Sequence, residues 1–146
     1  MKSIIVIPTY NEKDNIKVLL PRIFKLSPLI HVLVSDDSSP DGTGDLVKEL
    51  QKEYKNISLI SRPKKMGLGR AYIDAFREVL KDGEVKNVIM MDADLSHNPE
   101  YLGDMLIKSD EFGVVVGSRY VTGGKTVGWE LWRRLLSYFG NLYCRL

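Results

Sequence analysis

Two carboxylates stand one residue apart in the stretch VIMMDADLSHNPEYL, residues 88–102, directly after an apolar run. If Val88–Met91 form a buried strand, side chains alternate between its two faces, so Asp92 and Asp94 project to the same side at its carboxyl end. Two like charges this close repel each other unless a positive group lies between them. A hard divalent cation with oxygen ligands meets that requirement. The alternative is that the acidic pair only ends a strand and caps the next helix.

Other polar motifs also follow apolar runs. PTYNE comes after the first run, DDSSPDGT after the second and GSRY after the fifth. In an open parallel sheet, ligands bind outside the carboxyl ends of the strands, so these motifs would share one edge with the acidic pair. The first turn contains no glycine, which argues against the phosphate cradle of a dinucleotide-binding domain. The same edge could instead bind a nucleotide whose diphosphate is neutralised by a metal.

Side chains in these motifs suit such a ligand. Tyr10 could stack on a base, while Glu12 and Asp37 could accept hydrogen bonds from base or ribose. The guanidinium of Arg119 could grip phosphate oxygens in bidentate fashion. Each residue also has a structural interpretation: Tyr10 as a packing residue, Asp37 as a turn former and Arg119 as a surface ion-pair partner. Their common edge favours a polar ligand site.

The elements that must position these groups alternate along the chain. Strands are predicted at 3–7, 30–35, 57–61, 87–91 and 113–117, and helices at about 12–26, 43–54, 68–82 and 99–108. Strand alternating with helix predicts an α/β fold with a largely parallel, Rossmann-like sheet flanked by helices. Asn11 and Asn98 are predicted to begin helices, and Pro21 is predicted to kink or break the first one.

Length and composition narrow the possibilities. With 146 residues, 44% of them hydrophobic, the chain predicts a single domain over residues 1–146. A net charge of +2 does not indicate binding to nucleic acid. One cysteine excludes an internal disulfide framework and fits a reducing compartment. No stretch approaches the roughly 20 apolar residues of a membrane span. The last segment still has a helical pattern at residue 146, so we expect the domain to be incomplete at its C-terminus.

Several motifs together carry a resemblance to a known family. IPTYNE, DDSSPDGT, GLGRAYIDAF, MDADLSHNPE, GSRY and GWELWRRLLS occur in the order and approximate spacing of dolichyl-phosphate (polyprenyl-phosphate) mannosyltransferases. These are inverting family 2 glycosyltransferases of GT-A fold. The resemblance implies transfer of mannose from GDP-mannose to dolichyl or polyprenyl phosphate, with Mg²⁺ or Mn²⁺ at the Asp-x-Asp motif. It also implies a peripheral position on the cytoplasmic face of a membrane.

The resemblance assigns roles to the matching positions. Donor binding falls to Pro8, Tyr10, Glu12, Ser35, Asp37, Asp92, Ala93, Asp94 and Arg119. The metal ligands would be Asp92, Asp94 and Ser96. The acceptor phosphate would meet Arg119, Arg133 and Ser137, and the catalytic residues would be Asp94, Arg119 and Arg133. Two departures from the family pattern matter. Tyr138 stands where many relatives carry a basic residue near the acceptor phosphate, and the sequence ends before the region in which relatives carry a further Arg and Lys for the donor.

The chemistry suits these residue types. Inverting transfer needs a nucleophile at the anomeric carbon and stabilisation of the departing diphosphate. A lipid phosphate is already anionic at neutral pH, so no strongly basic side chain has to deprotonate it. Metal and arginines would bring two anionic substrates together.

Other interpretations are open at this point. The chain could be a non-catalytic sugar-nucleotide-binding fragment, or a glycosyltransferase that uses UDP-glucose. MMDADLS also resembles the nucleophile motif of haloacid-dehalogenase-type phosphohydrolases, although three predicted strands precede it here. The final segment, WELWRRLLSYFGNLYCRL, predicts an amphipathic helix that either packs on other parts of the protein or lies on a membrane surface.

Overall fold

The computed structural model describes residues 2–121, 123–124 and 128–144. The chain forms two compact units, Met1–Gly113 and Val114–Leu146, and each is described separately. The elements of the first unit are β1 (Lys2–Thr9), α1 (Lys13–Leu26), β2 (His31–Asp36), α2 (Thr43–Glu53), β3 (Ile57–Ser61), α3 (Leu68–Val79), β4 (Val85–Met90), the 3₁₀ turn η1 (Pro99–Tyr101) and α4 (Leu102–Lys108). The second unit contains α5 (Leu131–Tyr143).

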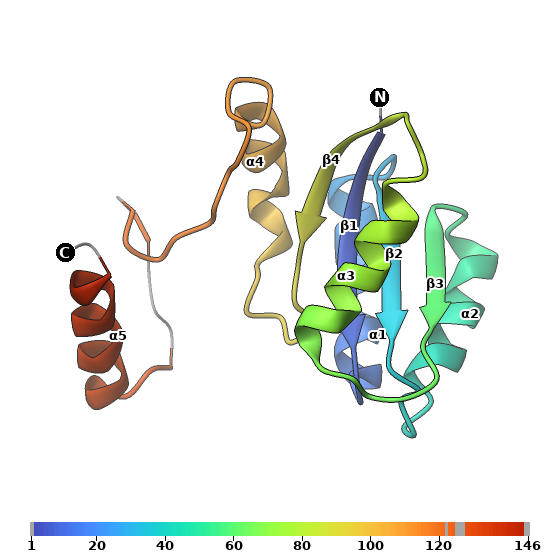
Figure 1. Cartoon of the computed structure of the whole chain (residues 1–146), viewed down its shortest axis with the longest axis horizontal. Coiled ribbons are helices and arrows are strands. Elements are labelled where there is room, and N and C mark those ends of the chain that lie inside the picture. Colours follow the sequence, from blue (N-terminus) through green and yellow to red (C-terminus); the bar gives the residue numbers. More distant parts are fainter. Residues whose placement is uncertain (1, 122, 125–127, 145–146) are drawn as a thin grey trace. The chain divides into compact units, whose positions relative to one another are not determined.

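The strands of the first unit form one sheet (Figure 1). Their order is β3-β2-β1-β4, and all three neighbouring pairs are parallel. Each strand is followed by a helical element, so the carboxyl ends of the strands meet at one edge of the sheet. The predicted parallel α/β fold and four of its five predicted strands are confirmed.

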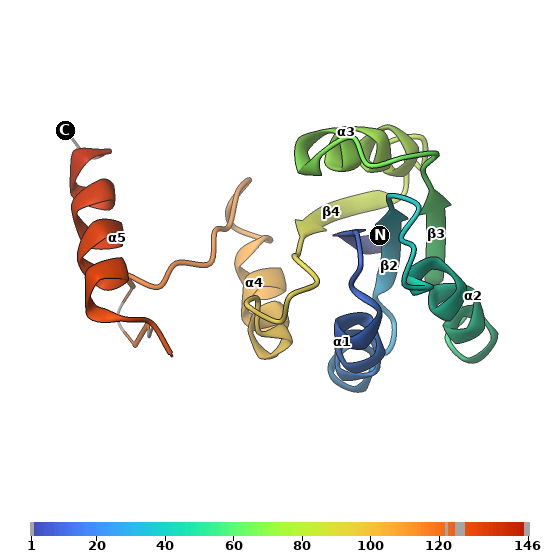
Figure 2. The same cartoon turned by 90° about the horizontal axis from the view of Figure 1, so that it is seen from below.

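Helices cover both faces of this sheet (Figure 2). α3 lies on one face, while α1, α2 and α4 lie on the other. Under α3 the core joins sheet and helix side chains: Ile4, Val6, Leu33, Tyr72, Ala75 and Val79. The helical members recur at intervals of three and four residues, so they form one face of α3. Burial on both faces explains why the central strands are almost entirely apolar.

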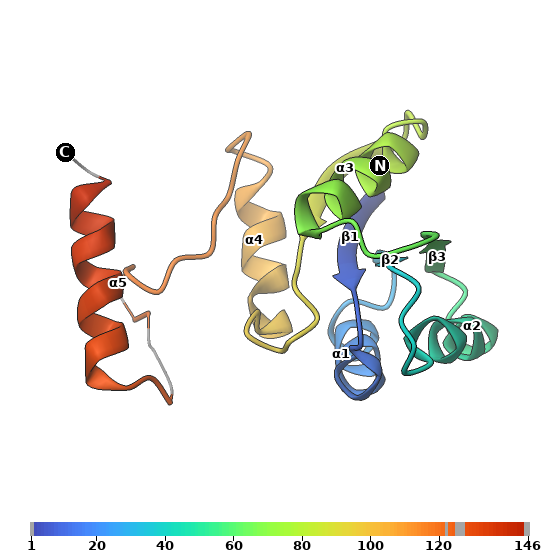
Figure 3. The same ribbon diagram turned by 60° about the horizontal axis from the view of Figure 1, so that its bottom comes forward.

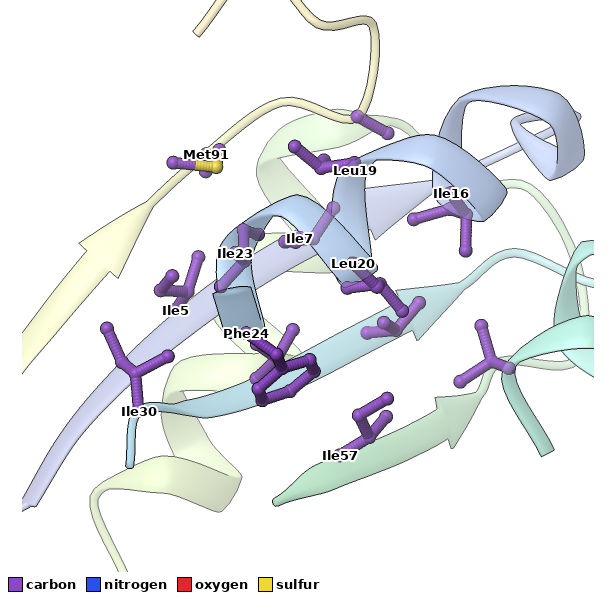
Figure 4. Close-up of a cluster of buried hydrophobic side chains, with 14 of the residues drawn as sticks. Ile5, Ile7, Ile16, Leu19, Leu20, Ile23, Phe24, Ile30, Ile57 and Met91 are labelled. Atoms are coloured by element: carbon purple, nitrogen blue, oxygen red, sulfur yellow. The ribbon is translucent and has the colours of Figure 1, made fainter. Parts of the chain in front are cut away.

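The larger core lies on the opposite face of the sheet (Figure 4). Ile5 and Ile7 of β1 point toward Leu19, Leu20 and Ile23 of α1, and none of the five is exposed to solvent. Alternate β1 residues therefore supply the two cores, because successive side chains of a strand point to opposite faces. This alternation determines which face of the sheet each side chain of β1 points to.

The fifth predicted strand, 113–117, is wrong. Within the described residues this segment has no strand partner, and Val114 and Val116 are 81% and 76% exposed. An apolar β-branched run favours extended backbone, but a strand exists only where another backbone supplies its hydrogen bonds. The sequence pattern alone gave no information on that partner.

The start of α1 also differs from the prediction. Asn11 does not cap the helix, because it adopts a left-handed conformation with φ of 60°. The free N–H groups are satisfied from the loop before α2. Lys13 donates its N–H to Asp41 Oδ2 at 3.0 Å, and Glu12 donates to Thr43 Oγ1 at 3.1 Å. These long-range caps join the loops after β1 and β2 at the edge where the candidate site lies.

Two further helix predictions have opposite outcomes. Asn98 does cap a helical turn, since its side chain accepts the N–H of Glu100 at 3.2 Å. A break at Pro21 is wrong, because α1 continues through this residue. Leu20 and Ile23 on either side are fully buried. Their packing offsets the hydrogen bond that a proline nitrogen cannot donate.

The second unit exposes most of its apolar residues. No side chain of α5 is buried, and the Tyr120 hydroxyl donates to Ser137 Oγ at 2.6 Å. The large exposed side chains of α5 are Leu131, Trp132, Leu135, Leu136, Tyr138, Phe139, Leu142 and Tyr143. In the described part of the chain, every helix is too short or too polar to cross a membrane.

Leu20→Ala is expected to lower the free energy of unfolding by about 2–5 kcal/mol, because it leaves a cavity in the larger core. The matched control is Leu80→Ala, a side chain that is 73% exposed. The control is expected to change stability by less than about 0.5 kcal/mol. Urea unfolding followed by circular dichroism compares the two variants. Equal losses would contradict the assignment of α1 to the core.

Candidate active site

Polar side chains collect at the carboxyl edge of the sheet, which comes forward in Figure 3. They are contributed by the segments after all four strands: Tyr10 and Glu12 after β1, Asp37 after β2, Arg62 after β3 and Asp92 after β4. The central strands β1 and β2 are largely buried between two layers of helix and leave little room for such groups along their length. The first unit therefore concentrates its polar chemistry at one edge, as the sequence predicted.

The acidic pair follows β4 in an alternating pattern of burial. Met91 and Ala93 are 4% and 3% exposed and pack in the larger core. The Asp92 side chain is 42% exposed, and Asp94 is exposed. This alternation agrees with both carboxylates lying on the solvent side of the chain. Leu95 then adopts a left-handed φ of 62°, a strained conformation for a residue with a Cβ.

Asp92 is held by two neighbours. The Tyr72 hydroxyl donates to Asp92 Oδ1 at 3.2 Å, and burial followed by the charge of Asp92 raises the pKa of that phenol well above its usual range. The Asp92 N–H donates to His97 Nδ1 at 3.2 Å. His97 Nε2 lies 3.8 Å from Asp92 Oδ2. Because Nδ1 accepts, a neutral His97 carries its proton on Nε2, facing the carboxylate.

Asp94 is ionised and open. Hydrogen bonds from the side chain and N–H of Ser96 lower the pKa of the Asp94 carboxyl, and the N–H bond to Oδ1 measures 2.9 Å. Two exposed carboxylates with free lone pairs fit a hard divalent cation. No set of three Asp, Glu, His or Cys side chains is grouped for metal binding within the described ranges. A cation here would complete its coordination with water, Ser96 or ligand oxygens, as Mg²⁺ commonly does.

The segments after β1 and β2 form the other side of the edge. Pro8 and Ser35 are paired in the sheet, and Ser35 is fully buried with no hydrogen-bond partner for its hydroxyl among the described residues. Tyr10 is partly exposed, and Lys65 Nζ lies 3.9 Å from the centre of its ring. Glu12 Oε2 accepts from Asn15 Nδ2 at 2.6 Å. Tyr10 is thus an accessible aromatic face that already attracts a cation.

Two consecutive aspartates at the end of β2 have different roles. Asp36 organises its own turn, accepting from Thr9 Oγ1 at 2.8 Å and from the Ser39 N–H at 3.0 Å. Asp37 is 5% exposed and forms an ion pair with Arg62, while its Oδ2 accepts the Met66 N–H at 3.1 Å. Asp37 therefore holds the loop after β3 in place, in addition to any contact with a ligand.

Arg62 is the main residue of this edge that the sequence analysis missed. It is 3% exposed, pairs with Asp37, and directs Nε to Asp74 Oδ2 of α3 at 3.2 Å. Its Nη2 has no hydrogen-bond partner among the described residues. The available signal was position, since Arg62 follows β3 directly, as the other site residues follow their strands. The sequence analysis also missed Lys65, which lies in the same loop after β3.

In the second unit, two of the predicted phosphate-binding residues meet on one aromatic ring. The guanidinium of Arg119 lies 4.3 Å from the centre of the Trp129 ring, and that of Arg133 lies 4.5 Å from it. Ser137, one turn beyond Arg133, accepts the Tyr120 hydroxyl. Cations over an indole face are attracted to it, so Trp129 gathers the two arginines. Both guanidiniums therefore lie against the same indole.

A parallel sheet with this strand order, a glycine-free first turn and an Asp-x-Asp pair after the fourth strand together define an α/β protein of the GT-A type. The profile of glycosyl transferase family 2 matches residues 4–145. The chain therefore belongs to glycosyl transferase family 2.

Two curated relatives share its sequence over the whole length. The undecaprenyl-phosphate mannosyltransferase of Micrococcus luteus is 42% identical over 146 residues, which are 100% of this chain and 60% of the relative. The polyprenol monophosphomannose synthase of Mycolicibacterium smegmatis is 42% identical over 147 positions, covering 99% of this chain and 55% of the relative. The chain thus spans somewhat more than half the length of these relatives.

Solved structures with the same fold are more distant. The mannosyltransferase PcManGT from Pyrobaculum calidifontis, in complex with GDP-Man and Mn²⁺, superposes with a TM-score of 0.54 at 25% identity, over 64% of this chain and 27% of that one. TarS of S. aureus gives a TM-score of 0.62 at 27% identity, over 76% of this chain and 20% of that one. Both confirm the fold class predicted from the sequence.

Arg62→Met is expected to lower the free energy of unfolding by about 3–5 kcal/mol, because it leaves the buried carboxylate of Asp37 without the guanidinium that neutralises it. The matched control is Arg70→Met, which removes a half-exposed arginine 3.5 Å from the same Asp74. The control is expected to cost less than about 1 kcal/mol. Chemical denaturation of both variants makes the comparison, and equal costs would contradict the structural role of Arg62.

Proposed function

We propose that this chain is the donor-binding part of an inverting glycosyltransferase that moves mannose from GDP-mannose to dolichyl or polyprenyl phosphate. The observation that carries the proposal is the pair of outward carboxylates, Asp92 and Asp94, at the ligand-binding edge of a GT-A sheet. Two relatives at 42% identity, named as polyprenyl-phosphate mannosyltransferases or synthases, support the choice of sugar and acceptor.

The donor would lie across the carboxyl edge of the sheet. Its guanosine would meet groups at the carboxyl ends of β1 and β2 and just after them, which are Pro8, Tyr10, Glu12, Ser35 and Asp37. Its diphosphate would reach the Asp92–Asp94 segment, with Ala93 providing the backbone between the two carboxylates. A bound Mg²⁺ or Mn²⁺ would act as a Lewis acid on the diphosphate. The complex of PcManGT with GDP-Man and Mn²⁺ supports this choice of ligand and metal.

The acceptor phosphate would meet Arg119, Arg133 and Ser137. One of its oxygens attacks the anomeric carbon of mannose, the bond from that carbon to the diphosphate breaks, and GDP leaves with the electron pair. The phosphate nucleophile is already anionic, so the protein does not have to accept a proton from it. The protein has to orient the phosphate and neutralise its charge. Arg119 and Arg133, gathered on Trp129, suit that task.

A lipid acceptor also implies a membrane surface. α5 exposes aromatic and leucine side chains together with Arg133 and Arg134 on one short helix. Apolar side chains at the headgroup boundary and arginines on anionic phosphates would hold the protein peripherally on the cytoplasmic face of a membrane. Packing of α5 against other protein segments is the competing interpretation.

The proposal is tested by a transfer assay with radiolabelled GDP-mannose and polyprenyl phosphate, followed by extraction of the labelled lipid. Labelled lipid that depends on Mn²⁺ would support it. Metal-dependent binding of GDP-mannose without transfer would favour the non-catalytic binding fragment instead. Faster transfer from UDP-glucose would favour the other glycosyltransferase, and release of free phosphate from a phosphate ester would favour a phosphohydrolase.

Asp92→Asn and Asp94→Asn are each expected to weaken GDP-mannose binding in Mn²⁺ by at least about tenfold, because each removes one negative ligand from the cation. Asp104→Asn, an exposed aspartate of α4, is the matched control and is expected to bind normally. Calorimetry with and without EDTA measures the affinities. Undiminished affinity in both variants, or a wild type indifferent to EDTA, would refute the metal site.

Replacement of Phe139 and Leu142 together by serine is expected to reduce binding to anionic liposomes by about tenfold or more, because two exposed apolar anchors are lost. Asn141→Ser, on the same helix, is the control. Binding of the unaltered chain is expected to weaken with salt. Cosedimentation makes the measurement. If the unaltered chain fails to bind at low salt, or the double variant binds equally well, α5 is a packing element.

A further inference from the structure

Tyr72 combines a buried ring with a hydroxyl directed at the acidic pair. The residue is 7% exposed and packs in the core under α3 with Ala75 and Val79. Its ring lies 5.8 Å from that of Phe76. The hydroxyl leaves this apolar surrounding and donates to Asp92 Oδ1 at 3.2 Å. Packing alone needs no hydroxyl at this position, because a phenylalanine ring would fill the same space without a polar atom to satisfy.

The helix that carries Tyr72 is fixed independently of Asp92. Two residues further along α3, Asp74 accepts from the buried Arg62 at 3.2 Å, and Arg62 in turn pairs with Asp37. The face of α3 that includes Ala75 and Val79 is buried against the sheet. The Tyr72 hydroxyl is therefore presented from a rigid support, which is what a group needs in order to orient a neighbour.

Asp92 needs such support more than Asp94 does. Its side chain is 42% exposed and lies beyond the end of β4. The N–H of Asp92 is bonded to His97 Nδ1, but this backbone contact does not fix the orientation of the carboxylate. An unrestrained carboxylate can rotate, whereas a metal ligand performs best when an outer contact fixes its orientation. The hydrogen bond from Tyr72 engages Oδ1 and leaves lone pairs on both oxygens available for a cation.

We infer that Tyr72 is a positioning residue that holds Asp92 in the orientation in which Asp92 and Asp94 share a divalent cation. This inference rests on the proposed function, since it concerns the same metal site. It adds that α3 connects the two sides of the donor site: Tyr72 supports the metal-binding carboxylate, and Asp74 supports Asp37 through Arg62.

The test is Tyr72→Phe, which keeps the ring and removes only the hydroxyl. Its matched control is Tyr101→Phe, whose ring is 61% exposed. Electron paramagnetic resonance of free Mn²⁺, titrated with protein in the presence of GDP, gives the metal affinity. We expect the dissociation constant for Mn²⁺ to rise about tenfold in Tyr72→Phe and to stay within about twofold of wild type in the control. The affinity for GDP in EDTA should not change.

Two further measurements separate positioning from a general loss of structure. The melting temperature shows whether Tyr72→Phe is folded at the temperature of the titration. In an Asp92→Asn background, adding Tyr72→Phe should have little further effect on Mn²⁺ affinity, because the carboxylate that it orients is gone. An equal loss in both backgrounds would mean that Tyr72 supports only the fold.

The outcomes are distinct. Wild-type Mn²⁺ affinity in folded Tyr72→Phe overturns the positioning role while leaving the metal site intact. Wild-type protein that binds no Mn²⁺ with GDP present overturns the metal site of the proposed function, and the inference with it.

Discussion

A strand enclosed between two layers of helix cannot carry charged side chains along its length, and the rest of this protein follows from that constraint. β1 and β2 supply apolar side chains to one core on each face of the sheet. Charged and aromatic groups are thereby displaced to the points where the strands end. Because the strands are parallel, those points coincide at one edge, and a ligand site arises there from segments that are far apart in the sequence.

The carboxylates at this edge divide into two kinds according to whether the protein neutralises them. Asp37 and Asp74 share the buried Arg62, and their charges are compensated inside the fold. Within the described residues, Asp94 has no ion-pair partner, and Asp92 has only His97 at 3.8 Å. Carboxylates left uncompensated and close together are unfavourable unless something else supplies positive charge. Asp37 and Asp74 thus stabilise the fold, whereas Asp92 and Asp94 are suited to bind an external cation.

Much of this arrangement could be predicted from the sequence because it depends on local periodicity. Short apolar runs located four strands, alternation by two predicted that Asp92 and Asp94 lie on one side of the chain, and the Asn98-Pro99 step located a helical turn. What failed depended on tertiary partners. The segment 113–117 has a strand-like composition but no strand partner among the described residues. Asn11 does not cap α1, whose first N–H groups are bonded instead by Asp41 and by Thr43 at the start of α2. Arg62 was missed because composition marks an arginine as exposed, and only the fold reveals two aspartates around it.

The proposed divalent cation would lie between Asp92 and Asp94 and hold the donor diphosphate at the carboxyl edge of the sheet. Anomalous diffraction at a wavelength where Mn²⁺ scatters strongly, from crystals grown with MnCl₂ and GDP, locates the cation without reference to activity. We expect one strong anomalous peak within coordination distance of both carboxylates and of the diphosphate. A fully occupied GDP site with no peak there, or a peak held by other residues, would contradict it.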